Sequence, residues 1–365
     1  MVGVAPPPAT VSSRDPRDRG GPLQPLLLVR HLKKHFKIHG GLLGGSGSRV
    51  HAVDDISFEI GKGETLGIVG ESGCGKSTTA RVLMRLIEPD SGEVIFDGEA
   101  VGTTGGLSLR ELRRGMQMVF QDSYASLNPR LPIEETVAFS PRVHGLDRRQ
   151  ARRRARSLLG RVGLDPDLYA RRYPHELSGG QRQRVNIARA LALEPRLVIL
   201  DEAVSALDKS VEAQVLNLLV DLKSELGLTY MFISHDLNVV QYLSDRVMVM
   251  YLGKVVEIGD VDAIYDDPRH PYTRALLAAM PSMDPDQPTM EAPLFGDPPN
   301  PIDPPSGCRF RTRCAFAEAV CERTEPALIP PEPRTSRSVG CHMSDPASGH
   351  SRAGVRFPFA SDHLQ

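Results

Sequence analysis

One stretch decides the fold of this chain: Gly70-Glu71-Ser72-Gly73-Cys74-Gly75-Lys76-Ser77. It has the spacing of a phosphate-binding loop, a glycine followed by four residues and then Gly-Lys-Ser. The apolar run 65–69 before it predicts a buried strand, and residues 76–86 after it have helical spacing. A phosphate loop requires this strand–loop–helix context, which disfavours the alternative of a glycine-rich turn without a ligand.

The loop residues have distinct expected roles in holding a nucleotide. Glycines let the backbone curl so that its N–H groups point at phosphate oxygens, and the N-terminus of the following helix adds partial positive charge. Lys76 should reach the β- and γ-phosphates of the nucleotide, and Ser77 should offer its hydroxyl to Mg²⁺. The residues expected to bind the nucleotide here are Gly70, Glu71, Ser72, Gly73, Cys74, Gly75, Lys76, Ser77 and Thr78.

A second apolar run, residues 197–200, ends in the carboxylates Asp201 and Glu202. The run predicts a buried strand whose end places Asp201 beside the phosphate loop, where it can hold the water shell of Mg²⁺. Glu202 projects differently and could take a proton from an attacking water. Such a pair can also cap a helix, but the phosphate loop upstream favours the metal and catalytic roles.

Composition excludes several classes of protein. The 365 residues suffice for one large domain plus an extension, and 24% charged and 40% hydrophobic residues are ordinary for a globular chain. The 44 Lys+Arg and 45 Asp+Glu nearly cancel, which argues against coating nucleic acid by bulk charge. No apolar run reaches the roughly 18–20 residues of a membrane-spanning helix, and the N-terminus lacks a signal-peptide core, so a cytoplasmic protein is expected.

Prolines mark the expected domain boundaries. Half of the 30 prolines fall in residues 1–25 and 281–306, where neither a long helix nor a central strand can form. The first stretch predicts a disordered tail and the second an extended linker. The expected division is a proline-rich tail at 1–25, a nucleotide-binding domain at 26–262, a cysteine-containing extension at 263–345 and a short tail at 346–365.

Between the proline-rich stretches, apolar strands alternate with helical patterns. Strands separated by helices predict a parallel sheet covered on both faces, and therefore an α/β fold. The glycine/serine stretch 40–47 predicts a flexible hairpin loop, and the arginine-rich stretch 148–161 predicts a helix with a solvated face. Besides 65–69 and 197–200, strands are expected at 26–29, 53–60, 231–233 and 247–250, and a helix at 211–226.

The stretch Leu177-Ser178-Gly179-Gly180-Gln181 indicates which kind of nucleotide enzyme this is. With it the chain resembles the ATP-binding-cassette (ABC) family, whose signature is Leu-Ser-Gly-Gly-Gln, over about residues 26–260. Phe36 lies where the family places an aromatic ring against adenine, with core packing as the alternative and His35 as a rival. The family's other motifs are matched by the Q-loop glutamine Gln121, the D-loop Ser205-Ala206-Leu207-Asp208 and the switch histidine His235.

The resemblance implies a P-loop ABC nucleotide-binding domain, with a RecA-like core at about 26–121 and 186–262 and a helical subdomain at about 122–185. Ser178 and the adjacent glycine amides open a helix and so form a second anion site. In the family this site faces the phosphate loop of a partner cassette, so that ATP binds between two cassettes. The implied residues are Glu202, His235 and Gln121 for catalysis, Phe36, Gln121, Asp201, Ser178, Gly179, Gly180, Gln181 and Asp208 for ATP, and Ser77, Gln121 and Asp201 for Mg²⁺.

Residues 121–130, Gln-Asp-Ser-Tyr-Ala-Ser-Leu-Asn-Pro-Arg, and 270–277, His-Pro-Tyr-Thr-Arg-Ala-Leu-Leu, narrow the resemblance. They are similar to the ATPase subunits of dipeptide/oligopeptide importers, in particular the F-type partner (DppF/OppF-like). This implies ATP hydrolysis that drives peptide uptake at the cytoplasmic face of the membrane. The implied partners are a D-type second ATPase, two permease subunits and, indirectly, an extracytoplasmic solute-binding protein, with no nucleic acid. Ala203 departs from the family's usual proline and predicts a less restrained backbone after Glu202.

Other functions remain open on the sequence. A nickel or other small-solute importer, or an exporter, would carry the same cassette. A soluble ABC protein of DNA repair or translation would typically have two cassettes or long insertions. A regulatory ATP sensor with a metal-binding tail is a third alternative, against which the presence of both Glu202 and His235 weighs.

The cysteines predict a metal centre near the C-terminus. Cys74 lies in the phosphate loop, and thiols clustered in a cytosolic protein favour metal over disulfides. Four thiolates suit Zn²⁺ or an iron–sulfur cluster, and resemblance to the importer ATPases implies 4Fe–4S, with Zn²⁺ and metal-free thiols as alternatives. Nothing in the sequence places the centre near ATP, so a structural role is expected. The four candidate ligands are Cys308, Cys314, Cys321 and Cys341.

Overall fold

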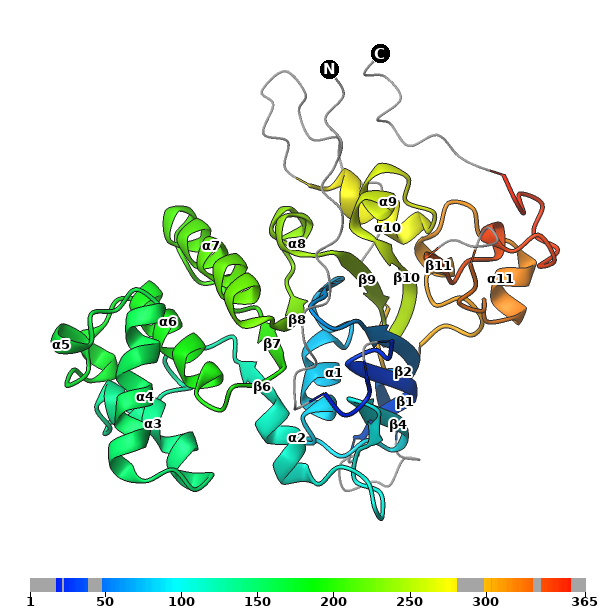
Figure 1. The fold of residues 1–365 in the computed structure, drawn as a ribbon. Coiled ribbons are helices and arrows are strands. Elements are labelled where there is room, and N and C mark those ends of the chain that lie inside the picture. The colour runs from blue at the N-terminus through cyan, green and yellow to red at the C-terminus, as the bar shows by residue number, and fades with distance from the viewer. Residues whose placement is uncertain are drawn as a thin grey trace, which may run out of the picture.

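The computed structural model describes residues 18–21, 23–38, 48–280, 299–302, 304–330 and 336–355. Two β-sheets form the centre, a lobe of helices projects on one side, and the C-terminal part of the chain packs on the other (Figure 1). Within the described ranges, no helix combines the length and the apolar character needed to cross a membrane. The expected loop 40–47 lies outside these ranges, and the tails 1–25 and 346–365 and the linker 281–306 lie partly outside them.

The larger sheet has seven strands in the order β11-β10-β9-β3-β8-β7-β6. Five of them, from β9 to β6, run parallel, and β10 and β11 are antiparallel additions at one edge. Every residue of β3, β7 and β8 is buried, as predicted for strands covered on both faces. The bounds are β3 Thr65–Val69, β6 Met116–Val119, β7 Leu197–Asp201, β8 Thr229–Ile233, β9 Arg246–Tyr251, β10 Lys254–Asp260 and β11 Ser338–Val339.

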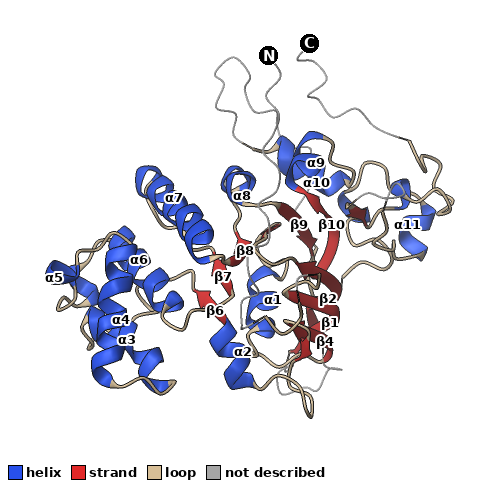
Figure 2. Cartoon of the chain, in the orientation of Figure 1, coloured by secondary structure: helices blue, strands red, loops and turns tan. Residues whose placement is uncertain are grey.

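The smaller sheet is antiparallel, with the order β2-β1-β4-β5, and stands beside the predicted parallel sheet. β1 and β2, like β4 and β5, follow one another too closely in the chain for the crossover that parallel neighbours need, whereas β4 pairs with β1 although β2, β3 and α1 lie between them in the sequence. Figure 2 shows it beside the larger sheet. The bounds are β1 Leu27–Lys37, β2 Arg49–Ile60, β4 Ser91–Phe96 and β5 Glu99–Ala100.

The helices fall into two groups, those beside the sheets and those of the helical lobe (Figure 1). In the lobe, α4 buries small and apolar residues such as Ala155 and Leu159, and Arg152 pairs with Glu135 of α3. The predicted solvated face includes the exposed Arg148, Arg149 and Arg153. Beside the sheets lie α1 Lys76–Leu83, α2 Leu109–Gly115, α7 Lys209–Leu226 and α8 Leu237–Leu243. The lobe contains α3 Ile133–Val143, α4 Arg148–Arg161, α5 Pro166–Tyr169, the 3₁₀ turn Pro174–Glu176 and α6 Gly179–Leu191.

The C-terminal segment, defined here as residues 304–330 and 336–355, attaches to the larger sheet through β11, where Val339 pairs with Glu257 and Ser338 with Ile258. Arg309, near its start, donates to the carbonyl of Leu252. This part of the chain is therefore tied to the nucleotide-binding part by backbone and side chain. The elements after the larger sheet are α9 Val261–Asp266, α10 Pro271–Ala278, α11 Ala319–Arg323 and the 3₁₀ turns Arg311–Arg313 and His342–Ser344.

Candidate nucleotide site

The phosphate loop lies wedged between the backbones of β2 and β9, and its glycines make this possible. A Cβ atom on Gly70 would lie 2.2 Å from the carbonyl oxygen of Met250, and one on Gly75 would lie 2.1 Å from that of Ala52. Both glycines have positive φ, 146° and 108°. Any other residue would have to push the loop away from its neighbours, so the glycines fix its path.

Lys76 lies folded across the inside of the loop. The residue is 5% exposed, and its Nζ donates to the carbonyl oxygens of Gly70 at 2.7 Å and Glu71 at 3.1 Å. The positive charge is thereby held where the backbone curls, as an anion site requires. Burial raises the pKa of the Cys74 thiol although Lys76 opposes the shift, so Cys74 serves as a neutral packing group.

Ser77 and Asp201 meet at the edge of the loop, as predicted from the end of β7. The Ser77 hydroxyl donates to Oδ1 of Asp201 at 2.8 Å. Burial raises the pKa of the Asp201 carboxyl, and the hydrogen bond from Ser77 and the charge of Arg81 oppose this shift. A hydroxyl and a carboxylate facing each other are hard oxygen ligands of the kind that Mg²⁺ prefers, so the residues fit this ion. A dication here would also stabilise the ionised carboxylate.

Glu202 lies at the meeting point of three segments distant in sequence. Nε2 of Gln121 donates to Oε2 of Glu202 at 2.8 Å, and Nδ1 of His235 lies 3.6 Å from the same oxygen. The Glu202 N–H donates to the Ile233 carbonyl at 2.9 Å, which orients the residue above β8. Its φ of 47° lies in the left-handed region, which is unusual for a residue with a side chain.

Asp201 and Glu202 do not cap a helix, so the alternative role of the pair as a helix N-cap is excluded. The helix that follows, α7, has Asp208 at its N-cap position, and Asp208 is exposed and makes no side-chain cap hydrogen bond. Ala203, where proline is usual in the family, is buried in the core. The Ser205 hydroxyl donates to the Glu202 carbonyl at 3.0 Å and helps to close the turn that the proline would otherwise restrain.

The signature stretch opens α6 with a capping box. The Ser178 hydroxyl accepts from the Gln181 N–H, and the Gln181 side chain accepts in return from the Ser178 N–H at 3.0 Å. Gly180 packs against α7, since a Cβ there would lie 2.4 Å from Cγ1 of Val211. Ser178 is exposed and Gly179 half-buried, so this helix end faces outward.

Of the two aromatic candidates for adenine, Phe36 is the more available. It is 37% exposed, and Lys34 Nζ lies 5.6 Å from its ring centroid. His35 instead pairs through Nε2 with Asp54 at 3.1 Å and stacks on His51 with ring centroids 4.0 Å apart.

The atoms of His35, His51 and Asp54 lie within 4.8 Å of one another, close enough to suggest a metal site. Asp54 is, however, already paired with Arg309 and lies 4.0 Å from Lys254. Although burial opposes the shift, these two cations hold the pKa of the Asp54 carboxyl well below its usual range. The cluster is therefore an ion-pair network rather than a metal site.

The four C-terminal cysteines line one narrow cavity and form no disulfides. Burial raises the pKa of Cys308 to about 11 and that of Cys341 to about 12, and the nearby thiols add to both shifts. Among the described residues, the three possible metal ligands that lie within 4.8 Å of one another are His35, His51 and Asp54, and no group of cysteines does so. No three of the four sulfurs therefore lie within 4.8 Å of one another. The four thiols thus face one cavity, but their sulfur atoms are not all in mutual contact.

Sequence reasoning missed the contacts of Glu71. Its N–H donates to the Tyr272 hydroxyl at 2.8 Å, and its carboxylate accepts from both terminal nitrogens of Arg313 at 2.8 and 3.0 Å. Arg313 precedes Cys314, so the cysteine-bearing segment touches the phosphate loop, contrary to the expectation that nothing places it near ATP. No sequence pattern signals an ion pair across 242 positions.

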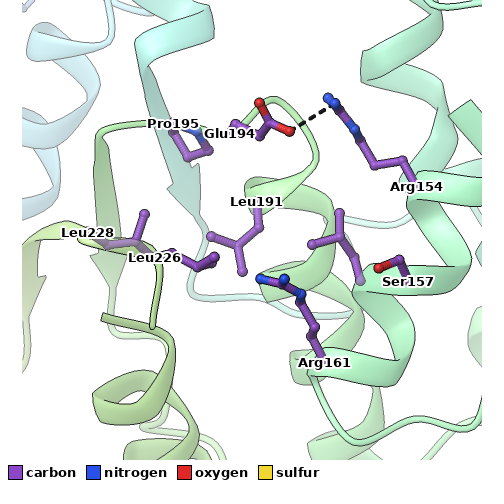
Figure 3. A pocket seen from close by; sticks show the side chains of 9 residues that line it. Arg154, Ser157, Arg161, Leu191, Glu194, Pro195, Leu226 and Leu228 are labelled. Carbon is purple, nitrogen blue, oxygen red and sulfur yellow. Dashed lines mark ion pairs between the residues drawn. The ribbon is translucent and has the colours of Figure 1, made fainter. Parts of the chain in front are cut away.

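A separate cavity of about 470 Å³ lies between α4 and the ends of α6 and α7 (Figure 3). Arg154 reaches across it and pairs with Glu194 at 2.8 Å, and Leu191, Leu226 and Leu228 form apolar walls. None of the sequence motifs lines it. It therefore belongs to the junction of the helical lobe with the sheet and not to the phosphate site.

Comparison with known proteins shows the family to which the chain belongs. The family model "ABC transporter" matches residues 53–205, and "Oligopeptide/dipeptide transporter, C-terminal region" matches residues 256–321. A probable peptide ABC transporter ATP-binding protein of Sinorhizobium fredii is 51% identical over 88% of this chain and 91% of its own length. The oligopeptide transport ATP-binding protein AppF of Bacillus subtilis is 47% identical over 87% of this chain and 97% of its own.

A solved structure supports the fold. CbiO1 from Clostridium perfringens, described as part of the ABC transporter complex CbiONQ, is 30% identical and superposes with a TM-score of 0.56. The match covers 66% of this chain and 90% of that one. The part of the chain shared with CbiO1 has the α/β architecture of an ABC nucleotide-binding domain.

Proposed function

The chain belongs to the family of peptide ABC transporter ATP-binding proteins, and we propose that Glu202, Gln121 and His235 perform its ATP hydrolysis. It is an ATPase subunit of a peptide importer. The observation that carries the assignment of residues is the convergence of Gln121 and His235 on one carboxylate oxygen of Glu202, beside the Ser77–Asp201 pair. Glu202 then orients or deprotonates the attacking water, and His235 faces it from β8.

ATP is the substrate, and the phosphate loop holds its phosphates. Lys76 exchanges its carbonyl partners for phosphate oxygens, and the loop amides donate to the same group. Ser77, Asp201 and Gln121 hold Mg²⁺, which would neutralise developing charge on the phosphates. Phe36 stacks on the adenine.

The site requires a second cassette. Ser178, Gly179, Gly180 and Gln181 form an anion site at an outward-facing helix end, and Asp208 is exposed beside it. A D-type ATPase that presents the same elements would complete the phosphate loop of this chain, and this chain would complete that of its partner. The support is the exposure of Ser178 at the start of α6, a helix of the lobe, whereas the phosphate loop precedes α1 beside the sheets (Figure 1).

The permeases dock between the helical lobe and the sheet. A cavity of about 370 Å³ lies next to Gln121, between α1, β6 and α3, with Phe120, Leu131 and the exposed Phe139 among its lining. An apolar hollow beside the catalytic glutamine suits a short helix of a membrane subunit. Two permeases at the cytoplasmic face, supplied by an extracytoplasmic solute-binding protein, complete the transporter.

We divide the chain at the positions indicated by its proline-rich stretches and by the resemblance to ABC cassettes: a tail at 1–25, the ATP-binding domain at 26–262 with its helical subdomain at about 122–185, the extension at 263–345 and a tail at 346–365.

The extension holds a 4Fe–4S cluster through Cys308, Cys314, Cys321 and Cys341. The four thiols line one cavity and suit either Zn²⁺ or an iron–sulfur cluster, and the resemblance to the importer ATPases favours the cluster. The cluster would cross-link a segment with little core of its own.

Metal analysis tests this centre. Anaerobic purification followed by iron, sulfide and zinc determination should give about four irons and four sulfides per chain. A stoichiometric zinc content would replace the cluster by Zn²⁺, and a metal-free chain with a folded C-terminal segment would refute the metal centre.

Reconstitution tests the function itself. The chain, a D-type partner and the permeases in sealed vesicles with the solute-binding protein should accumulate a labelled dipeptide only when ATP is supplied on the side of the ATPases. ATP hydrolysis that persists while labelled dipeptides and oligopeptides are not accumulated would contradict peptide import.

A further inference from the structure

Two side chains from the C-terminal half of the chain, those of Tyr272 and Arg313, form hydrogen bonds with Glu71 of the phosphate loop. Arg313 holds both oxygens of the Glu71 carboxylate, at 2.8 and 3.0 Å, and Tyr272 accepts the Glu71 N–H at 2.8 Å. The two-point contact of a guanidinium with a carboxylate fixes orientation as well as distance. Glu71 is thereby held by its backbone and by its side chain.

The segment that carries Arg313 is itself firmly docked. Phe310 packs edge-on against Tyr251 with ring centroids 5.3 Å apart, and lies 5.4 Å from Tyr272. Arg309 binds the Leu252 carbonyl and the Asp54 carboxylate. These contacts fix the stretch 308–314 over the end of β9, so Arg313 approaches the loop from a rigid base.

The negative charge of Glu71 connects its ion pair with Arg313 to the binding of ATP. Glu71 directly follows the first glycine of the loop, and its carbonyl accepts from Lys76, the residue that meets the phosphates. An unpaired carboxylate there would repel the triphosphate. The Arg313 side chain is only 6% exposed, so water screens the pair weakly.

We propose that Arg313 is a positioning residue of the ATP site, which neutralises Glu71 and holds the phosphate loop in the shape that accepts the triphosphate. The C-terminal segment is then part of the nucleotide site and not only an appendage to it. The inference rests on the proposed ATP site and adds a residue that does not touch ATP.

Equilibrium titration of the full chain with a fluorescent ATP analogue and Mg²⁺ tests this role, with thermal unfolding measured in parallel. Arg313→Ala should weaken binding by at least about fivefold, and Arg323→Ala, on an exposed arginine of the same segment, should leave it unchanged. Arg313→Lys should lie between, because an ammonium keeps the charge but not the two-point geometry. Adding Glu71→Gln to Arg313→Ala should restore most of the affinity, which a merely structural role would not produce.

Each result decides the question. A folded Arg313→Ala protein that binds the analogue like the original chain overturns the proposal, and so does a double variant no better than Arg313→Ala alone. If Arg313→Ala does not unfold cooperatively, the titration is repeated with Arg313→Lys and with the nearly isosteric Tyr272→Phe. If both variants bind the ATP analogue as tightly as the original chain, the proposal is overturned. Failure of the original chain to bind the analogue would instead contradict the ATP site.

Discussion

The phosphate loop and the N-terminal end of α6 are both glycine-containing segments that we propose to bind the phosphates of ATP, and their surroundings are opposite. The loop is enclosed: the β2 and β9 backbones press on its glycines, Lys76 fills it, and Glu71 is gripped from outside. At the end of α6, the hydrogen bonds of Ser178 go to Gln181 and Arg182 of its own helix, and the residue is exposed. The phosphate loop is enclosed by other parts of its own chain, whereas the end of α6 is exposed, as our proposal of a partner cassette requires.

The contrast implies that residues around the phosphate loop bind and hydrolyse ATP, while the end of α6 acts only in the dimer. Glu202→Gln tests hydrolysis and has the largest expected effect. Removing the carboxylate should lower turnover by about 10²- to 10⁴-fold, while ATP binding persists because the phosphate loop is intact. Steady-state hydrolysis and nucleotide affinity should be measured with the partner present, with Glu225→Gln on the surface of α7 as the matched control. Near-normal hydrolysis would remove Glu202 from catalysis.

Lys76→Ala should act on binding first. It removes charge-assisted hydrogen bonds worth about 1.5–3 kcal/mol, equivalent to a roughly 10- to 150-fold weaker affinity for ATP. Lys223→Ala, which breaks only a surface pair with Asp245, is the control in the same titration. Unaltered affinity would mean that the ammonium does not face the phosphates.

Ser178→Ala addresses the outward-facing site. Hydrolysis by the mixed dimer should fall by about tenfold, the loss of one hydrogen bond to a charged group, while ATP binding to the isolated chain stays the same. Loss of the cap should also cost about 1 kcal/mol in the free energy of unfolding. A drop in the ATP affinity of the isolated chain would erase the distinction between the two sites.

Phe36→Ala should give the smallest effect, a roughly 2- to 10-fold weaker affinity for ATP from lost stacking. His35→Ala is the informative companion, because His35 is engaged with Asp54 and His51. Competition binding with the two variants compares them directly. A larger loss for His35→Ala would make His35 the adenine contact.

The sequence predicts those parts of the site that lie within local patterns. The strand–loop–helix around Lys76, the strand that ends at Asp201 and the helix that Ser178 opens are each encoded within about ten residues. The convergence of Gln121, Glu202 and His235 is implied by family resemblance, and the structure places the three together.

Contacts between distant segments could not be predicted. The hairpin loop predicted at 40–47 indicates that β1 and β2 pair, but the pairing of β4 with β1 is not specified by the alternation of apolar residues within either strand. The ion pair between Glu71 and Arg313 depends on where the C-terminal segment docks, and both residues appear in the sequence as ordinary charged side chains.

The dependence of hydrolysis on a second cassette tests the central claim most directly. ATPase rate per chain should be measured at fixed concentration of this chain while the D-type partner is added, with mass measured on the same samples. The account predicts a low rate for the monomer, and a rate that rises with the partner and saturates as the dimer forms. Full activity, independent of concentration, in a sample shown to be monomeric would contradict it.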